Sequence, residues 1–371
     1  MSVKCSVVAN VLEEIAPRKL AEDWDHVGLL VGSPDQEIQN ILVTLDVTAQ
    51  AVEFAVKNRI NLIISHHPLL FKAIHTIRTD LPQGKLLADL LSNQIAVYAA
   101  HTNLDSARGG VNDVLAERLG LGNSQTLRSG QSEGLLKLVV YVPQTHLDAV
   151  RSAITEAGAG HIGNYSHCAF ATEGTGSFLP LAGTHPFLGK TDQLEYVSEC
   201  RLETILPEHN ISQVLTAMRA AHPYEEVAYD LYPLFNKIDG LGLGRIGDLP
   251  VKTTLREFAL LVCEKLGTGV KVCGDLSGQV QRVAVCGGSG ADLIQDAVRA
   301  GADLFVTGDI KYHEAQQAAA MGLVIIDAGH FATEYPVVAA VVVKLRQNVA
   351  LQGLSITGFG GEKDIFDWID R

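Results

Sequence analysis

The chain has 371 residues, 47% of them hydrophobic and 19% charged, which is enough apolar material for two or three packed domains and excludes a disordered protein. Its formal net charge is −13 and it has no block rich in lysine or arginine, so nucleic acid is not an expected partner. No apolar run approaches the roughly 20 residues that cross a membrane, so no membrane partner is expected either.

The first third of the chain alternates between strand-like and helix-like segments. Its N-terminus has the pattern of a strand or coil followed by a helix, not of a signal peptide. Apolar β-branched runs then predict strands, and helical spacing predicts helices between and after them, with Gly120 or Gly122 past the end of the last helix. The predicted strands are 41–47, 61–65 and 94–100, and the predicted helices are 48–58 and 111–120.

The last third repeats this alternation. We expect Ser289 to cap the first of its helices, and we expect a long helix, apolar on nearly every face, to begin at Phe331. Strands that alternate with helices imply an α/β fold with mainly parallel sheets and helices on both faces. The predicted strands are 280–288, 302–308 and 323–329, and the predicted helices before Phe331 are 291–301 and 311–321.

The middle of the chain contains an internal repeat. Residues 137–154 align with 200–218 at an offset of 64, with Pro143 matching Pro207. Each copy has the pattern of a strand, a helix begun at a proline and a second strand, and two such units in tandem predict an α+β ferredoxin-like module. We therefore expect an inserted ferredoxin-like domain at 129–240 and a discontinuous α/β core made of 1–128 and 241–371.

Histidine and carboxylate side chains lie just past the ends of three predicted strands, two in the first third of the chain and one in the last. The carboxyl edge of an open α/β sheet is where such folds place ligands. His330 and Glu334 are four residues apart at a helix start, so they share one face and can reach one ion. The candidate metal ligands are His66, His67, Asp105, His330 and Glu334.

The number and type of these ligands predict two metal ions. One structural zinc needs four ligands in a closed shell, whereas five candidates, two of them carboxylates, fit a two-metal site with ions ~3.5–4 Å apart. Imidazole together with carboxylate suits zinc, iron, manganese or nickel better than calcium. Such a pair can activate water and polarise a phosphoryl or carbonyl oxygen.

Three more polar residues lie close to these motifs. His101 and His313 are the candidate catalytic residues, as acid/base groups or substrate contacts. Either can instead orient a ligand or be an ordinary loop histidine. Asp46, in the strand at 41–47, can also face the site.

The six cysteines are scattered, mostly in apolar runs, and form no C-x-x-C pair. This pattern is typical of buried, reduced thiols, so we expect a cytoplasmic protein.

Five motifs together make the sequence similar to a known family. It resembles the NIF-three-like dinuclear metal-centre proteins, whose members are often labelled GTP cyclohydrolase type 2 homologues, over essentially the whole chain. The stretch HPYEEVAYD (222–230) resembles the ferredoxin-like insert of the longer bacterial members. The motifs are WDHVGLLVG (24–32), SHHPLLF (65–71), AAHTNLD (99–105), TGDIKYHEA (307–315) and DAGHFATE (327–334).

The resemblance implies a two-lobed core, a ligand assignment and an assembly. One ion would be held by His67, Asp105 and Glu334, and the other by His66, His330 and Glu334. The family implies a toroidal homohexamer with the metal sites facing an inner cavity. One departure is visible: His26 stands where the family usually has asparagine, and it can contact substrate, add a ligand or merely pack.

These observations favour a metal-dependent hydrolase that acts on a nucleotide or another small phosphorylated or cyclic substrate, as the cyclohydrolase label implies. The alternative is a metal carrier or metal-responsive binding protein without catalysis, because ferredoxin-like modules often serve ligand sensing. A protein with a purely structural metal is a third possibility. Neither the native metal nor the substrate follows from the residues.

Overall fold

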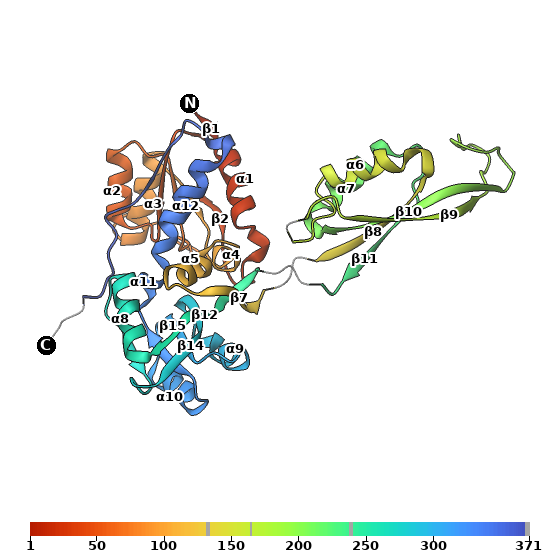
Figure 1. Ribbon diagram of the computed structural model, residues 1–371. Helices are drawn as coiled ribbons and strands as arrows, with labels where there is room; N and C mark the ends of the chain where they lie inside the picture. Colours follow the sequence, from red (N-terminus) through yellow and green to blue (C-terminus); the bar gives the residue numbers. More distant parts are fainter. Residues whose placement is uncertain (131–133, 164, 237–239, 368–371) are drawn as a thin grey trace. The chain divides into compact units, whose positions relative to one another are not determined.

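The computed structural model describes residues 1–130, 134–163, 165–236 and 240–367 (Figure 1). The chain divides into two compact units, of which unit 1 comprises Met1–Gln131 with Asp239–Arg371 and unit 2 comprises Ser132–Ile238. In the part of the chain that is described, no helix has the length and apolarity needed to cross a membrane.

The first lobe of unit 1 is built on a five-stranded sheet in the order β17-β4-β5-β6-β2. Strands β17 to β6 are parallel, and β2 is antiparallel to β6 at the edge. The three inner strands are apolar at nearly every position because both faces of the sheet are covered. The strands are β2 (Gly28–Val31), β4 (Asn40–Thr44), β5 (Leu62–Ser65), β6 (Ala96–Ala99) and β17 (Ser355–Gly358).

Helices pack on both faces of this sheet (Figure 1). Successive strand residues point to opposite faces, so Ile41 joins the core beneath α1 and α12, while Leu42 joins the core beneath α2 and α3. A short ladder of β1 (Val3–Lys4) with β3 (Glu37–Ile38) flanks the lobe. The helices are α1 (Cys5–Ile15), α2 (Ala49–Lys57), α3 (Pro82–Ser92) and α12 (Pro336–Gln347).

The second lobe is built on a six-stranded sheet in the order β13-β16-β15-β14-β12-β7. Only β14, β15 and β16 are parallel to one another, while β12, β7 and β13 join antiparallel. The α/β class is confirmed, but both sheets are mixed: the first is mainly parallel with one antiparallel edge strand, and the second has only three parallel strands. The strands are β7 (Gly122–Ser129), β12 (Gly242–Thr254), β13 (Lys271–Cys273), β14 (Gln279–Ser289), β15 (Leu304–Gly308) and β16 (Val324–Asp327).

Helices also cover both faces of the second sheet. Thr254 begins α8 with a capping box that includes Glu257, and Gly267 ends it in the left-handed region at φ 68°. Ser289 is not the expected helix cap, because it is the last residue of β14 and Gly290 begins a 3₁₀ turn instead. The helices of this lobe and of its junction with the first are α4 (Thr102–Ser106), α5 (Val111–Arg118), α8 (Leu255–Leu266), α9 (Ile294–Arg299) and α10 (Tyr312–Ala320).

The long helix expected from Phe331 is two helices. α11 (His330–Glu334) ends before Tyr335, and α12 begins at Pro336. Proline has no N–H to donate to the preceding turn, so it favours the first position of a new helix. The apolar face of α12 is buried in the core of unit 1, and this burial accounts for its composition.

Unit 2 is a four-stranded antiparallel sheet in the order β11-β8-β10-β9 with two helices. Its elements follow the order β-α-β-β-α-β, which is the element order of ferredoxin-like modules. The internal repeat coincides with this symmetry, since Pro143 and Pro207 each end a strand before a 3₁₀ turn and a helix. The elements are β8 (Leu135–Pro143), α6 (Leu147–Glu156), β9 (Ala169–Phe178), β10 (Glu195–Pro207), α7 (Ile211–Ala221) and β11 (Tyr229–Leu234).

The independence of the two units can be tested by deletion. The chain leaves and re-enters unit 1 at one place, because Ser129 pairs with Gly242 and the Gly130 N–H donates to the Leu241 carbonyl at 3.4 Å. Replacing residues 131–240 with Asn-Gly should close β7 and β12 into a two-residue hairpin, because Gly130 lies opposite Leu241. We expect a folded, metal-binding product, measured by circular dichroism and metal content, since the five candidate ligands lie in unit 1. A folded product without metal would show that unit 2 shapes the site.

Candidate metal centre

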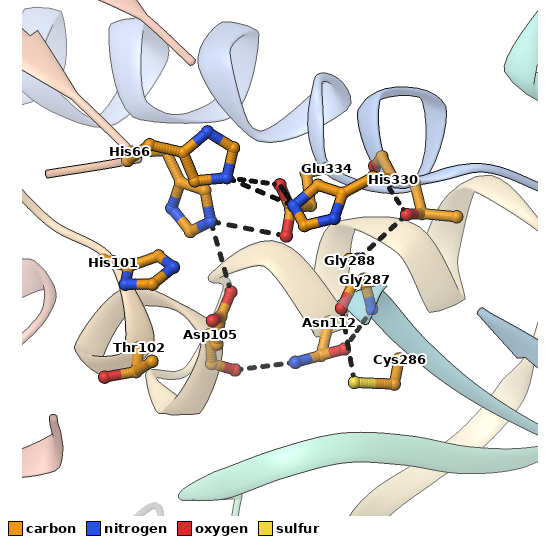
Figure 2. A network of polar contacts seen from close by, with 12 residues as sticks. His66, His101, Thr102, Asp105, Asn112, Cys286, Gly287, Gly288, His330 and Glu334 are labelled. Carbon is orange, nitrogen blue, oxygen red and sulfur yellow. Dashed lines mark hydrogen bonds and ion pairs between the residues drawn. The ribbon is translucent and has the colours of Figure 1, made fainter. Parts of the chain in front are cut away.

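The five candidate ligands lie together in unit 1, as Figure 2 shows for the four that it labels. His66 and His67 follow β5, Asp105 lies in α4 after β6, and α11 after β16 carries the other two. The Nε2 atom of His66 is 3.6 Å from Asp105 Oδ1 and 3.7 Å from Glu334 Oε1. The carboxyl ends of strands from both lobes therefore meet at one site, as the positions of the motifs predict.

Glu334 lies at the centre of the cluster. Its Oε2 atom is 3.0 Å from His67 Nε2 and 3.2 Å from His330 Nε2, and the residue is only 3% exposed. Behind it stands Gly288 at φ 63°, where an added Cβ would come within 2.1 Å of Glu334 Oε1. Glycine at this position is thus required for the carboxylate to reach the histidines.

Four imidazoles around the cluster share one orientation. Each has its Nδ1 atom against an oxygen acceptor, so the Nδ1 proton is donated outward and the Nε2 lone pair of the neutral ring faces inward. This is the usual way in which proteins orient metal-binding histidines. The pairs are His66 with the Ala100 carbonyl (2.9 Å), His67 with Asp46 (2.9 Å), His101 with Asp25 (3.1 Å) and His330 with Asp309 (2.7 Å).

This orientation brings lone pairs face to face. The Nε2 atoms of His67 and His330 are 3.3 Å apart, and both lie against the Glu334 carboxylate. The Nε2 atom of His66 and Oδ1 of Asp105 are buried without any hydrogen-bond partner. Acceptors that face one another in a buried site are unfavourable unless a proton or a metal cation lies between them. The donor set therefore fits metal ions.

Protonation takes the place of a cation in the metal-free chain. Burial opposes the charged form of His67, but the Asp46 and Glu334 carboxylates outweigh it and raise its pKa to about 10. The hydrogen bond to Glu334 raises the pKa of His330 to about 9. Burial raises the pKa of Asp105 to about 7.

Metal loading is expected to release protons. At pH 7.5 the metal-free chain holds protons on His67 and His330 because both pKa values lie above this pH. A metal ion needs the Nε2 lone pairs, so about two protons per chain should leave, and fewer as the pH approaches about 10. Calorimetry in buffers of different ionisation enthalpy measures this release. Asp46→Asn should reduce it, and proton-neutral loading at pH 7.5 would contradict the expectation.

The structure places the two candidate catalytic residues differently. His101 lies at the cluster, where its ligand atom and those of His66 and His67 are all within 4.8 Å of one another. His313 is exposed on α10, where its ring contacts Tyr312, and it is absent from the metal-type clusters found among the described residues. His26 is also exposed, and its backbone N–H donates to Asp25.

Sequence reasoning missed two residues that orient histidines. Asp25 receives the Nδ1 proton of His101 and also accepts from the Thr102 N–H and hydroxyl. Asp309 holds His330 from a loop 21 residues earlier in the chain. Both lie within motifs of the family resemblance, 24–32 and 307–315, and that position was the available signal.

The fold and the site together define an α/β protein with clusters of histidine and carboxylate side chains that could hold metal ions. A protein-family model described as Duf34/NIF3 (NGG1p interacting factor 3) matches residues 3–360. The chain belongs to this family, so the resemblance seen in the sequence is confirmed.

Individual relatives match at nearly full length. The chain is 47% identical over 332 residues to a "GTP cyclohydrolase 1 type 2 homolog" of Bacillus subtilis, which covers 89% of each chain. It is 41% identical over 341 residues to the protein of the same name from Mycobacterium tuberculosis, covering 91% of this chain and 89% of the relative. A crystal structure of a Bacillus cereus protein related to NIF3 superposes with a TM-score of 0.91 at 44% identity and covers 98% of both chains.

Proposed function

We propose that the cluster binds two divalent metal ions and that the protein is a metal-dependent hydrolase of a nucleotide or another small phosphorylated or cyclic substrate. The observation that carries this proposal is the set of inward-facing Nε2 lone pairs around the Glu334 carboxylate, which needs cations to be stable. The name of the curated relatives, GTP cyclohydrolase 1 type 2 homolog, supports the hydrolytic class.

The distances favour a division of ligands that differs from the one the family resemblance implies. His67, His330 and Glu334 form one group of three ligand atoms, and His66, Asp105 and Glu334 form another. Because Glu334 belongs to both, we propose that its carboxylate bridges the two ions. The mixture of imidazole and carboxylate suits zinc, iron, manganese or nickel.

A cavity of about 600 Å³ opens onto the cluster and is lined by His67, His101 and Glu334 among others. This volume is in the range of small-molecule sites. A metal pair bound there would supply Lewis-acid activation of water and of a phosphoryl or carbonyl group. His101, held at Nδ1 by Asp25, has its Nε2 atom free to take a proton from attacking water or to give one to a leaving group, so we propose it as the acid/base residue.

Activity assays decide between hydrolysis and metal transport. Protein loaded separately with zinc, iron, manganese and nickel should hydrolyse at least one member of a panel of nucleotides and cyclic phosphates, and His101→Ala should reduce kcat while the metal content stays high. A complete lack of turnover with all four metals would refute the hydrolase. Rapid transfer of metal to an acceptor protein would then favour the metal carrier.

The homohexamer is a further proposal that rests on family membership. Sedimentation equilibrium at micromolar concentration should give six times the mass of one chain, 39.8 kDa. A monomer under these conditions would refute the assembly.

A further inference from the structure

Two large aromatic side chains stand exposed beside the metal centre. Trp24 is 55% exposed and Phe71 is 53% exposed, and both line the same cavity of about 600 Å³ as His67 and Glu334. An aromatic side chain contributes most to binding free energy when a ligand covers it, because about 150–250 Å² of its surface can then be buried, a general range for such residues. Two of them left open at one wall of a cavity mark a surface on which a ligand can pack.

The rings of Trp24, Phe71 and His101 contact one another at steep angles. The Trp24 ring centroid is 5.8 Å from that of Phe71 at an interplanar angle of 55°, and 6.0 Å from that of His101 at 74°. The Phe71 and His101 rings are 6.4 Å apart and nearly perpendicular, at 72°. His101 in turn lies 5.1 Å from the ring of His66. His101 therefore lies between the metal cluster and the Trp24–Phe71 pair. A small molecule bound at the cluster can also contact these two rings.

The exposure of Trp24 is imposed by its neighbours in the sequence. Asp25 binds the His101 ring and accepts from the N–H and hydroxyl of Thr102. The Glu22 N–H donates to the same hydroxyl at 2.9 Å. These contacts hold the backbone on both sides of Trp24, so its indole stays at the rim of the cavity. The same loop thus orients a histidine of the cluster and presents an aromatic surface.

A cationic side chain in the lining of the cavity bears on where a ligand's negative charge binds. Arg128 lines the cavity, but its guanidinium is already paired with Asp292 at 2.7 Å and with Asp296 at 2.6 Å. Its charge is therefore matched within the protein. An oxyanion of the ligand is expected at the metal cluster, and the uncharged part of the ligand is expected against the aromatic rings.

We propose that Trp24 and Phe71 form a subsite for a planar heteroaromatic ring of the substrate, whose oxyanion binds at the metal cluster. This inference rests on the proposed metal-dependent hydrolase and narrows its substrates to molecules that carry both groups, such as nucleotides. Stacking of a base on an aromatic side chain is worth about tenfold or more in affinity by alanine substitution. Trp24 is a specificity-determining residue in this view.

Binding measurements without turnover test the subsite. The chain has two tryptophans, so Trp368→Phe leaves Trp24 as the single indole whose fluorescence can be followed. With metal-loaded protein, guanosine and adenosine monophosphate should quench Trp24, and ribose 5-phosphate, which lacks the ring, should not. Calorimetry should show that Trp24→Ala and Phe71→Ala each weaken nucleotide binding about tenfold. Both variants should bind ribose 5-phosphate like the wild type, and Trp24→Tyr should retain most of the nucleotide affinity.

A control variant and the metal content show whether any loss of nucleotide binding is specific to the two rings. Phe170 is also exposed, at 68%, but it lies in unit 2, so Phe170→Ala should leave both affinities unchanged. Wild-type nucleotide affinity in Trp24→Ala and Phe71→Ala would overturn the inference, as would equal binding of nucleotide and ribose 5-phosphate by the wild type. Loss of metal from both variants would also overturn it, because the rings would then only support the cluster. Ring-dependent binding without hydrolysis would keep the subsite and refute the hydrolase.

Discussion

Replacing Glu334 with alanine is expected to remove most of the metal from the protein, from about two ions per chain to fewer than one. The Glu334 carboxylate lies 3.0 Å from His67 Nε2, 3.2 Å from His330 Nε2 and 3.7 Å from His66 Nε2. It belongs to both groups of ligand atoms that include a carboxylate. Without it, each group keeps two ligands, and the negative charge that offsets the cations falls.

Metal content after loading and gel filtration measures this effect. Glu334→Gln keeps the volume of the side chain but removes its charge, so it should lose metal nearly as completely. Glu117→Gln on the exposed side of α5 makes the same chemical change away from the cluster and should keep the wild-type content. Two ions retained by Glu334→Ala would be incompatible with a bridging role.

Replacing Arg245 with methionine is expected to lower the free energy of unfolding of unit 1 by about 3 kcal/mol. Arg245 is 1% exposed and donates to the Gly242 carbonyl at 2.7 Å and to the Gly244 carbonyl at 2.8 Å. It also pairs with Asp113 of α5, which ties this helix to β12. Methionine fills much of the same space but removes the donor to both carbonyls and the cation that pairs with the carboxylate.

Urea unfolding of the metal-free protein measures this loss without the contribution of bound ions. Adding Asp113→Asn to Arg245→Met should recover part of the stability, because the unpaired carboxylate is then removed. Arg282→Met breaks an ion pair that is 40% and 46% exposed at its two side chains, so it should cost less than about 1 kcal/mol. Equal effects of Arg245→Met and Arg282→Met would show that burial of the Arg245 pair contributes little.

The sequence by itself determined most of the elements of unit 1 and the candidates for its site. Apolar runs predict β4, β5, β6, β14, β15 and β16, because strands buried on both faces need apolar residues at nearly every position. Ligand-type residues placed after these strands could be expected to meet, since the ends of parallel strands share one edge of a sheet. The repeat likewise indicated the two β-α-β halves of unit 2 through its matching prolines.

Only the tertiary structure decided how those candidates act. His101 and His313 both follow predicted strands, but one lies at the cluster and the other is exposed, because side-chain direction depends on the local backbone and its packing. Asp25 and Asp309 orient His101 and His330 from 76 and 21 residues away in the chain, and hydrophobic patterning does not encode such pairs. The antiparallel pairing of β12 and β13 could not be predicted either, because hydrophobic patterning indicates burial and not the direction in which a neighbouring strand runs.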